Sequence, residues 1–130
     1  MSNEKKPQAA IDEKEFEAAM KEAENSVSHY THEFAKPFTF EGETFETLSF
    51  DFGMLTAADS IAIEAELASI GRSVFAPEIS GDYLLRMAMR ACTDKRKDGR
   101  KLGADAFLAM PLADFNKIRG KARSFLLRSA

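Results

Sequence analysis

The sequence predicts an α+β fold that is mainly helical, with an N-terminal β-hairpin packed on a small bundle of three to four helices. A phenylalanine-rich stretch interrupted by Glu41 and Gly42 is typical of a hairpin, because glycine tolerates the positive φ of tight turns. After residue 55, apolar residues recur at helical spacing and are separated by glycine, proline and polar loops.

The 130 residues suit a single domain. We expect residues 1–28 to be an acidic tail and residues 29–130 to be the domain. Within the tail, four apolar residues on one helical face predict a short helix over residues 11–27. These four are Phe16, Met20, Ala23 and Val27.

The expected location is the cytoplasm. No apolar run approaches the roughly 20 residues that span a bilayer, and the N-terminus lacks the apolar core of a signal peptide. The chain has one cysteine, Cys92, which fits a reducing compartment.

The net charge of −3 conceals a strong asymmetry. Residues 29–80 carry 2 basic and 9 acidic groups, whereas residues 81–130 carry 12 basic and 5 acidic groups. Either the two halves attract each other, or the basic half meets a charged partner such as a nucleic acid. Aromatic side chains do not interleave with the basic cluster as base-stacking platforms would, which weakens the second interpretation.

The first strand is expected to place Phe34, Phe38 and Phe40 on one face, since they share one parity. Pro37 has no N–H and therefore indicates an edge strand. The return strand, residues 43–50, alternates less regularly. Two strands are marginal alone, so the hairpin must pack on helices or on another chain.

Thr56 and Asp59 resemble a capping box and predict a helix that runs to about residue 69. Gly71 is its expected C-cap, and its expected buried side is Ile63, Leu67 and Ile70.

Ser80 is expected to cap a second helix, residues 81 to about 93. Apolar residues cover most of this helix, which predicts a central position in the domain. Its polar stripe is Asp82, Arg86 and Arg90.

A polar loop over residues 94–101 and a short helical turn over residues 103–110 precede a final helix, residues 112–127. The expected apolar face of that helix is Leu112, Phe115, Ile118, Ala122, Phe125 and Leu126. Two basic i, i+4 pairs lie on its other faces: Lys117 with Lys121, and Arg119 with Arg123. Gly120 interrupts the helix at a cost of about 1 kcal/mol relative to alanine, and would permit a close helix contact.

No catalytic or metal site is predicted. His29 and His32 are the two histidines of the chain, and zinc usually takes four ligands. We expect them to lie in a solvated segment before the first strand. Cys92 lies on an apolar helix without an activating base, which predicts a buried structural thiol. The lysines of residues 95–101 either contact phosphates or belong to a solvated loop.

The order of these elements resembles the tail assembly chaperones of long-tailed bacteriophages, including those of the Mu-like type. The resemblance covers residues 36–128 and rests on the hairpin and on three segments: LTAADSIAIEAEL, ISGDYLLRMAMRACT and LGADAFLAMPLADFNKIRGKARSFLL. The last segment is the most specific, with a short helix over residues 104–110, a break at Pro111, and then Leu112-Ala113-Asp114-Phe115.

This resemblance implies a protein that is not an enzyme and needs no cofactor. Such chaperones bind the tape measure protein, keep it soluble while tail tube subunits assemble, and are absent from the mature virion. A candidate partner-binding surface combines Phe38, Phe40, Phe45, Leu112, Phe115 and Phe125. The tail tube protein and a second copy of the chain are further possible partners; a membrane is not expected. The alternative function is a small nucleic-acid-binding or regulatory protein that uses the basic C-terminal half.

Overall fold

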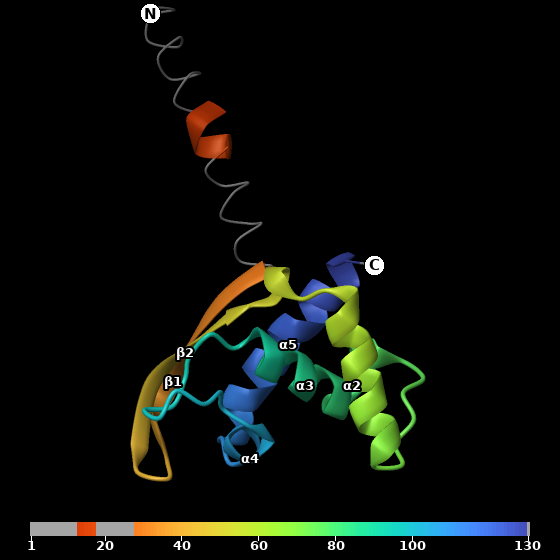
Figure 1. Ribbon diagram of the computed structural model, residues 1–130. Coiled ribbons are helices and arrows are strands. Elements are labelled where there is room, and N and C mark those ends of the chain that lie inside the picture. Colours follow the sequence, from red (N-terminus) through yellow and green to blue (C-terminus); the bar gives the residue numbers. More distant parts are fainter. Residues whose placement is uncertain (1–12, 18–27, 130) are drawn as a thin grey trace, which may run out of the picture.

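The computed structural model describes residues 13–17 and 28–129. From residue 28 onward it consists of a two-stranded antiparallel hairpin beside a group of helices (Figure 1). The elements are β1 (His29–Phe40), β2 (Glu43–Asp51), the 3-10 turn η1 (Phe52–Met54), α2 (Ala57–Ser69), the 3-10 turn η2 (Pro77–Ile79), α3 (Gly81–Ala91), α4 (Ala104–Leu108) and α5 (Leu112–Ser129). The hairpin contacts α5 and α3, and α3 also contacts α2. This arrangement confirms the expected α+β fold.

The hairpin turn is formed by Glu41 and Gly42, as the sequence predicts. Their φ angles are +48° and +82°. Two consecutive positive φ angles are typical of the type I′ turn, whose twist matches that of the flanking strands. Phe40 accordingly pairs with Glu43 directly across the turn.

A large bulge divides β1 into two parts. Glu33 pairs with Thr47, but the next register pair is Phe38 with Phe45, so four residues of β1 lie opposite one residue of β2. Pro37 falls within this bulge, where its missing N–H interrupts no ladder hydrogen bond. The bulge also makes β1 a poor template for pairing with another strand.

The bulge explains the irregular alternation of the second strand. Leu48 and Phe50 are buried on one side of the bulge, whereas Phe45 packs against the core on the other side. Each part alternates with period two. The odd number of extra residues in β1 exchanges the faces of β2 between the two parts. On β1, Phe34 and Phe38 are buried on one face, as expected.

α3 lies at the centre of the helical group, as its wide apolar surface predicts. Its buried side chains are Tyr83, Leu84, Leu85, Met87, Ala88 and Ala91. The Ser80 hydroxyl accepts a hydrogen bond from the Tyr83 amide at 3.1 Å and caps the helix. The helix ends at Ala91, earlier than expected, because Cys92 forms a β-bridge with Phe50 at the edge of β2.

α2 begins and ends at the predicted residues. The Thr56 amide donates to the Asp59 carboxylate at 2.8 Å, within a capping box. Gly71 has a φ of +76°, and the Arg72 amide donates to the Leu67 carbonyl at 2.9 Å. This hydrogen bond, which spans the six residues 67–72, and the left-handed glycine together define a Schellman motif.

Two expected core residues lie on the surface instead. Ile70 is 53% exposed and Leu112 is 73% exposed. Ile70 follows the last residue of α2, where the chain turns away. Leu112 opens α5, whose buried row runs through Ile118 and Ala122. At about 100° per residue, Leu112 lies roughly 120° from the middle of that row.

The expected helix over residues 11–27 is described in part. Residues 13–17 are helical, and Phe16 is 66% exposed. Met20, Ala23 and Val27 lie outside the described residues. The division into a tail of residues 1–28 and a domain of residues 29–130 stays a prediction.

Candidate interaction surfaces

The six side chains predicted to bind a partner do not lie on one surface. Phe38 is buried, and Leu112 is well exposed at the start of α5. The other four pack against the core while partly buried: Phe40, Phe45, Phe115 and Phe125. Their role in partner binding stays a prediction, in which Leu112 presents the largest exposed fraction of the six.

The aromatic side chains of the hairpin pack at opposite ends of it. Near the turn, Phe38 stacks on Phe40 with ring centroids 6.3 Å apart. After the end of β2, Phe52 stacks on Phe125 of α5 at 5.9 Å. These contacts join the hairpin to itself and to α5, so they leave little of the predicted aromatic surface for a partner.

A buried hydrogen-bonded pair joins the hairpin to α5. His32 Nε2 lies 2.8 Å from Asp114 Oδ1, and the side chains are 1% and 6% exposed. The expectation that His32 belongs to a solvated segment is therefore wrong, because β1 already begins at residue 29. The sequence held one signal of this pair, since Asp114 interrupts the apolar face of the last helix.

Tyr30 completes this cluster. Its hydroxyl lies 2.8 Å from His32 Nδ1, so both ring nitrogens of His32 have partners. Burial, and then the negative charge of Asp114, raise the pKa of Tyr30 above its ordinary value. Lys121 of α5 lies over the Tyr30 ring, 5.3 Å from its centroid. With both nitrogens engaged, His32 acts as a structural joint and presents no free base.

Ion pairs join α2 to α3. Arg90 contacts Asp59 at 2.8 Å and Glu66 at 3.0 Å, and Arg86 lies 3.6 Å from Glu66. The pKa of Asp59 is lowered by the hydrogen bond from the Thr56 amide and then by Arg90. The polar stripe of the second helix thus faces the acidic side of the first.

A second set of ion pairs joins the polar loop to the hairpin. Arg96 contacts Glu41 at 2.6 Å and Glu43 at 3.2 Å. The Lys97 amide also donates to Glu43 at 3.1 Å. Together with the α2–α3 pairs, these contacts confirm the interpretation that the acidic and basic halves attract each other.

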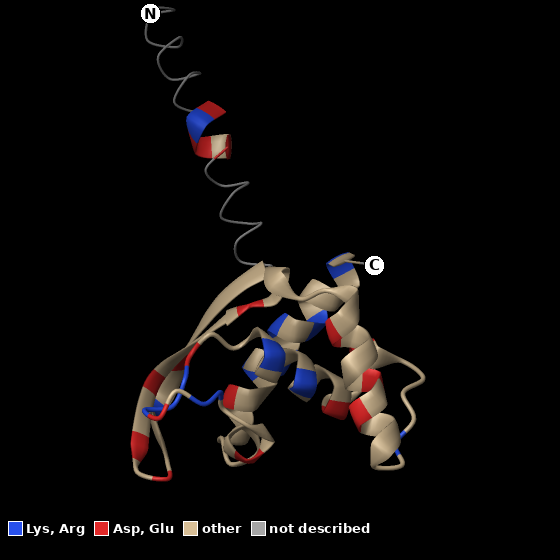
Figure 2. Cartoon of the chain, viewed as in Figure 1, with Lys and Arg blue, Asp and Glu red and all other residues tan. Residues whose placement is uncertain are grey.

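The cations of α5 differ from those of α3 in that they form no ion pair with a carboxylate of the described residues. Figure 2 shows Lys and Arg along this helix, and Asp and Glu on α2 and on the hairpin. Within the described residues, no ion pair joins a carboxylate to Lys117, Arg119, Lys121, Arg123 or Arg128. Arg123 instead donates to the backbone carbonyl of Glu78 at 3.0 Å. Among the described residues of the basic half, these five cations and the loop lysines Lys95, Lys97 and Lys101 form no ion pair with a carboxylate.

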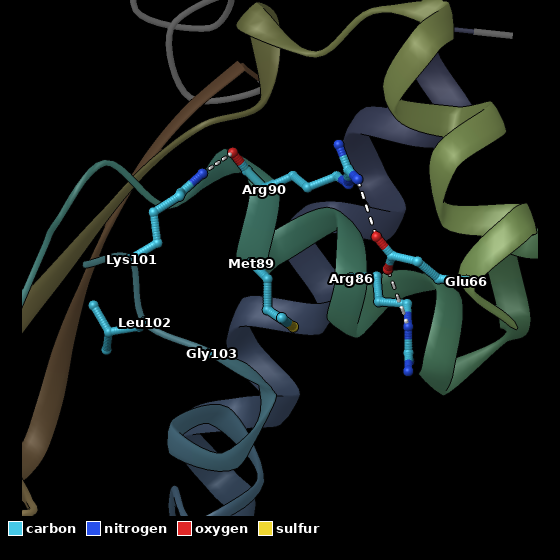
Figure 3. Close-up of a pocket in the computed structure, with 7 residues that line it drawn as sticks. All are labelled: Glu66, Arg86, Met89, Arg90, Lys101, Leu102 and Gly103. Carbon is cyan, nitrogen blue, oxygen red and sulfur yellow. Dashed lines mark hydrogen bonds and ion pairs between the residues drawn. The ribbon is translucent and has the colours of Figure 1, made fainter. Parts of the chain in front are cut away.

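An open cleft of about 400 Å³ lies beside α3 (Figure 3). Its lining residues are Glu66, Arg86, Met89, Arg90, Lys101, Leu102 and Gly103. In Figure 3, Glu66 reaches between the two arginines, and Lys101 donates to the Arg90 carbonyl at 3.1 Å. The charged groups of this cleft are therefore largely engaged with one another, and we assign it no ligand.

A second open cleft, of about 360 Å³, lies between the start of α2, α3 and the end of α5. Phe125 and Leu126 line one side, and Ile63 and Met87 line the other. At its edge, the Ser60 and Tyr83 hydroxyls are 2.8 Å apart. Of the six predicted partner-binding residues, this cleft exposes part of Phe125.

Several large apolar side chains are exposed outside these clefts. Phe75, in the loop between α2 and α3, is 98% exposed, and Ile79 is 72% exposed. Leu108 at the end of α4 and Ile61 on α2 are 71% and 67% exposed. The position of Phe75 between Gly71 and Pro77 is the one signal of its exposure that the sequence holds, because glycine and proline are typical of surface loops.

Cys92 is a buried thiol, as predicted, and 2% of its surface is exposed. Burial is the main cause that raises its pKa from about 9 to about 11. In residues 13–17 and 28–129, no group of three or more His, Cys, Asp or Glu side chains is placed to hold a metal ion. In the same residues, no helix combines the length and the apolar character needed to cross a membrane.

Comparisons with protein-family models, with curated proteins and with solved structures found no match for this chain. Three features of the described residues bear on function: the exposed apolar side chains, the cations of α5 that pair with no carboxylate, and the buried joint between the hairpin and the last helix.

Proposed function

We propose that this protein is a phage or prophage tail assembly chaperone that binds the tape measure protein and keeps it soluble during tail assembly. It acts in the cytoplasm of the bacterial host without catalysis or a cofactor, and it does not enter the mature virion. The tail tube protein is a further partner in this proposal.

The observation that carries the proposal is the exposure of large apolar side chains on so small a domain. Phe75 buries almost none of its surface, and Ile79 follows it closely in the same loop. Aromatic and aliphatic side chains are frequent anchors of protein-binding sites, and these two lie four positions apart in the chain. A tape measure protein is a long helical chain, and its apolar stripes need such contacts until the tail tube covers them.

The closing segment that resembles tail assembly chaperones also has a structural role here. Its Asp114 is buried and bonds to His32 of the hairpin. The two landmarks of the resemblance, the hairpin and the last helix, are thus held together by one polar contact. This supports an architectural role of the Leu112–Phe115 segment in this chain.

The polar groups of the described residues also favour binding over catalysis. The Cys92 thiol is buried with a raised pKa, and both ring nitrogens of His32 are engaged. A nucleophile or a general base needs an accessible reactive atom. Neither side chain offers one.

Co-expression with the tape measure protein encoded beside it tests the proposal. The chain should raise the soluble fraction of the tape measure protein and co-purify with it. The double variant Phe75→Ser/Ile79→Ser should do so less well, because it removes exposed apolar surface, while the exposed control Thr47→Ser should behave as the unaltered chain. If the unaltered chain neither co-purifies with the tape measure protein nor changes its solubility, the proposal is wrong.

A second candidate function, nucleic-acid binding, is favoured by the cations of α5 that pair with no carboxylate among the described residues. Phosphate contacts would make the affinity fall steeply with salt. A titration with DNA and RNA at low salt tests it, and the absence of binding there would exclude it.

A further inference from the structure

The outer face of α5 has an ordered composition. With about 100° per residue, the exposed positions of this helix span an arc whose middle is Gly120. The central strip of this arc is uncharged: Ala113, Asn116, Gly120, Ser124 and Leu127. Leu127 is 56% exposed, so the strip has an apolar end as well as small residues.

Basic side chains flank this strip on both sides. Arg119 and Arg123 lie along one edge of the arc, and Lys117, Lys121 and Arg128 lie along the other. All five are exposed. Elsewhere in the described residues, Arg86, Arg90 and Arg96 each pair with a carboxylate, whereas the loop lysines Lys95, Lys97 and Lys101 pair with none. What distinguishes this face is therefore the arrangement of its cations in two rows.

Gly120 is not required by the packing of this chain. A Cβ atom added there would meet nothing within 4 Å, and its φ is not in the left-handed region that favours glycine. Glycine weakens the interior of a helix relative to alanine. A glycine at the middle of an exposed arc is therefore explained better by the close approach of another backbone than by the fold itself.

We propose that the outer face of α5 is the docking site for one helix of a partner protein, an amphipathic helix with a narrow apolar stripe flanked by carboxylates on both sides. The stripe packs on the strip around Gly120, and the carboxylates meet the two rows of cations. This inference deepens the proposed function and rests on it for the identity of the partner, since it names the surface and the chemistry that a tape measure helix would need.

The charges and the shape of the face favour a protein helix over a nucleic acid. Phosphate-binding surfaces place cations along the path of the backbone, but here the middle of the arc is small and uncharged. The face also lacks an exposed aromatic side chain for base stacking. Two parallel rows of cations about a small central strip instead match the two flanks of a helix.

The test measures binding of synthetic peptides to the full-length protein by fluorescence anisotropy. The probe is an amphipathic peptide of about 18 residues, or roughly five helical turns, with an alanine and leucine stripe flanked by glutamate. Its control carries lysine in place of glutamate. We expect the acidic peptide to bind and the basic peptide not to bind, with weaker binding in high salt because the flanking pairs are exposed.

Two variants locate the binding. Lys117→Glu/Lys121→Glu should lower the affinity by about tenfold, while Lys95→Glu/Lys97→Glu, the same charge change on the exposed loop, should leave it within about twofold. Gly120→Gln should also weaken binding, because its side chain fills the central strip while the helix is retained. Circular dichroism and thermal unfolding establish that each variant is folded.

The same variants distinguish the proposed partner helix from other occupants of this face. The proposal is overturned if the acidic peptide does not bind, or if the loop variant weakens binding as much as the α5 variant. It is also overturned if a DNA duplex binds this face more tightly than the peptide and Lys117→Glu/Lys121→Glu removes that binding. A dimer in analytical ultracentrifugation that this same variant dissociates would identify a second copy as the occupant. Peptide binding without any effect on the tape measure protein would refute the proposed function and leave the docking site standing.

Discussion

His32 and Asp114 form a buried polar contact between the hairpin and α5. The two residues are 82 positions apart in the chain, and both are nearly inaccessible to solvent. A buried polar pair of this kind adds little net stability compared with apolar residues of the same shape. Removing one partner alone is costly, because the facing polar atom of the other, His32 Nε2 or Asp114 Oδ1, is then buried without the hydrogen bond that joined the pair.

We therefore expect Asp114→Ala to lower the free energy of unfolding by about 3 kcal/mol, measured by urea denaturation. Glu46→Ala, on the exposed face of β2, is the control and should change it by less than about 0.5 kcal/mol. The double variant His32→Leu/Asp114→Leu should recover part of the loss, since neither member of the buried pair then faces a missing partner. The recovery is partial because the Tyr30 hydroxyl and the Ala35 amide each lose an acceptor or partner. An Asp114→Ala protein as stable as the control would show that the pair does not hold the hairpin.

Cys92 should make the protein sensitive to alkaline pH. Its pKa is about 11 in the folded protein, against about 9 ordinarily, so above pH 9 the unfolded chain releases the thiol proton and the folded chain keeps it. The free energy of unfolding should therefore be unaffected below pH 9 and fall by about 2 kcal/mol as pH rises towards 11. Tyr30, with its pKa also raised, acts in the same direction.

Urea denaturation between pH 8 and pH 11 measures this loss. Cys92→Ala should show a shallower decline over the same range, because one of the two titrating groups is gone. An identical decline in the variant would assign the alkaline loss to other residues. At pH 8, the thiol of the folded protein should also resist alkylation that proceeds readily in urea.

At the scale of elements, α5 has two faces with different requirements. Its inner face carries Asp114, Ile118 and Ala122 into the core, whereas its outer face carries Gly120 between rows of cations. The inner face is closely packed, so a substitution there lowers the stability of the protein. The outer face is under no such constraint within this chain, which separates a stability test from a binding test.

We expect Gly120→Ala to raise the free energy of unfolding by about 1 kcal/mol, because alanine restricts the unfolded chain and its Cβ meets no atom within 4 Å. Thermal and urea denaturation measure the change. Gly42→Ala is the matched control: its φ of +82° strains any L side chain, so that variant should be less stable than the unaltered protein. A loss of stability in Gly120→Ala would mean that the glycine serves the fold.

At the scale of the whole molecule, ion pairs and apolar packing make different contributions to stability. The acidic and basic halves are joined by exposed or half-buried ion pairs, each of which contributes little on its own. The apolar core around α3 contributes most of the stability, since this helix contacts α2, α4, α5 and β2. Phe75 and the cations of α5 lie outside both systems, and they are the surfaces that the proposed function assigns to a partner.

Hydrogen exchange should reflect this division. We expect the amides of α3 to exchange most slowly, at the rate of global unfolding, and those of residues 73–76, in the loop between α2 and α3, to exchange within the shortest labelling times. Mass spectrometry of labelled peptides measures both. If α2 or α5 were protected more strongly than α3, the core would not be centred on that helix.

Much of the fold is readable from the sequence because it is set by neighbouring residues. The Glu41–Gly42 turn, the Thr56 and Ser80 caps and the Gly71 C-cap depend on local backbone geometry, which a few side chains determine. The central position of α3 follows from its composition. The candidate interaction surface is harder to predict from the sequence. Most of the aromatic side chains predicted to bind a partner pack against the core, and local patterns do not predict the exposure of Phe75.

The sequence by itself thus determined the fold class, the order of the elements, most of their ends and the charge division of the chain. The tertiary structure alone decided three features: the exchange of the faces of β2 across the bulge, the burial of His32, and which apolar side chains stay exposed. Register, burial and ion pairing depend on contacts between residues far apart in the chain, as between His32 and Asp114. Local propensity does not determine which distant residue a side chain will contact in the folded protein. Those features therefore form only when the hairpin packs on α5.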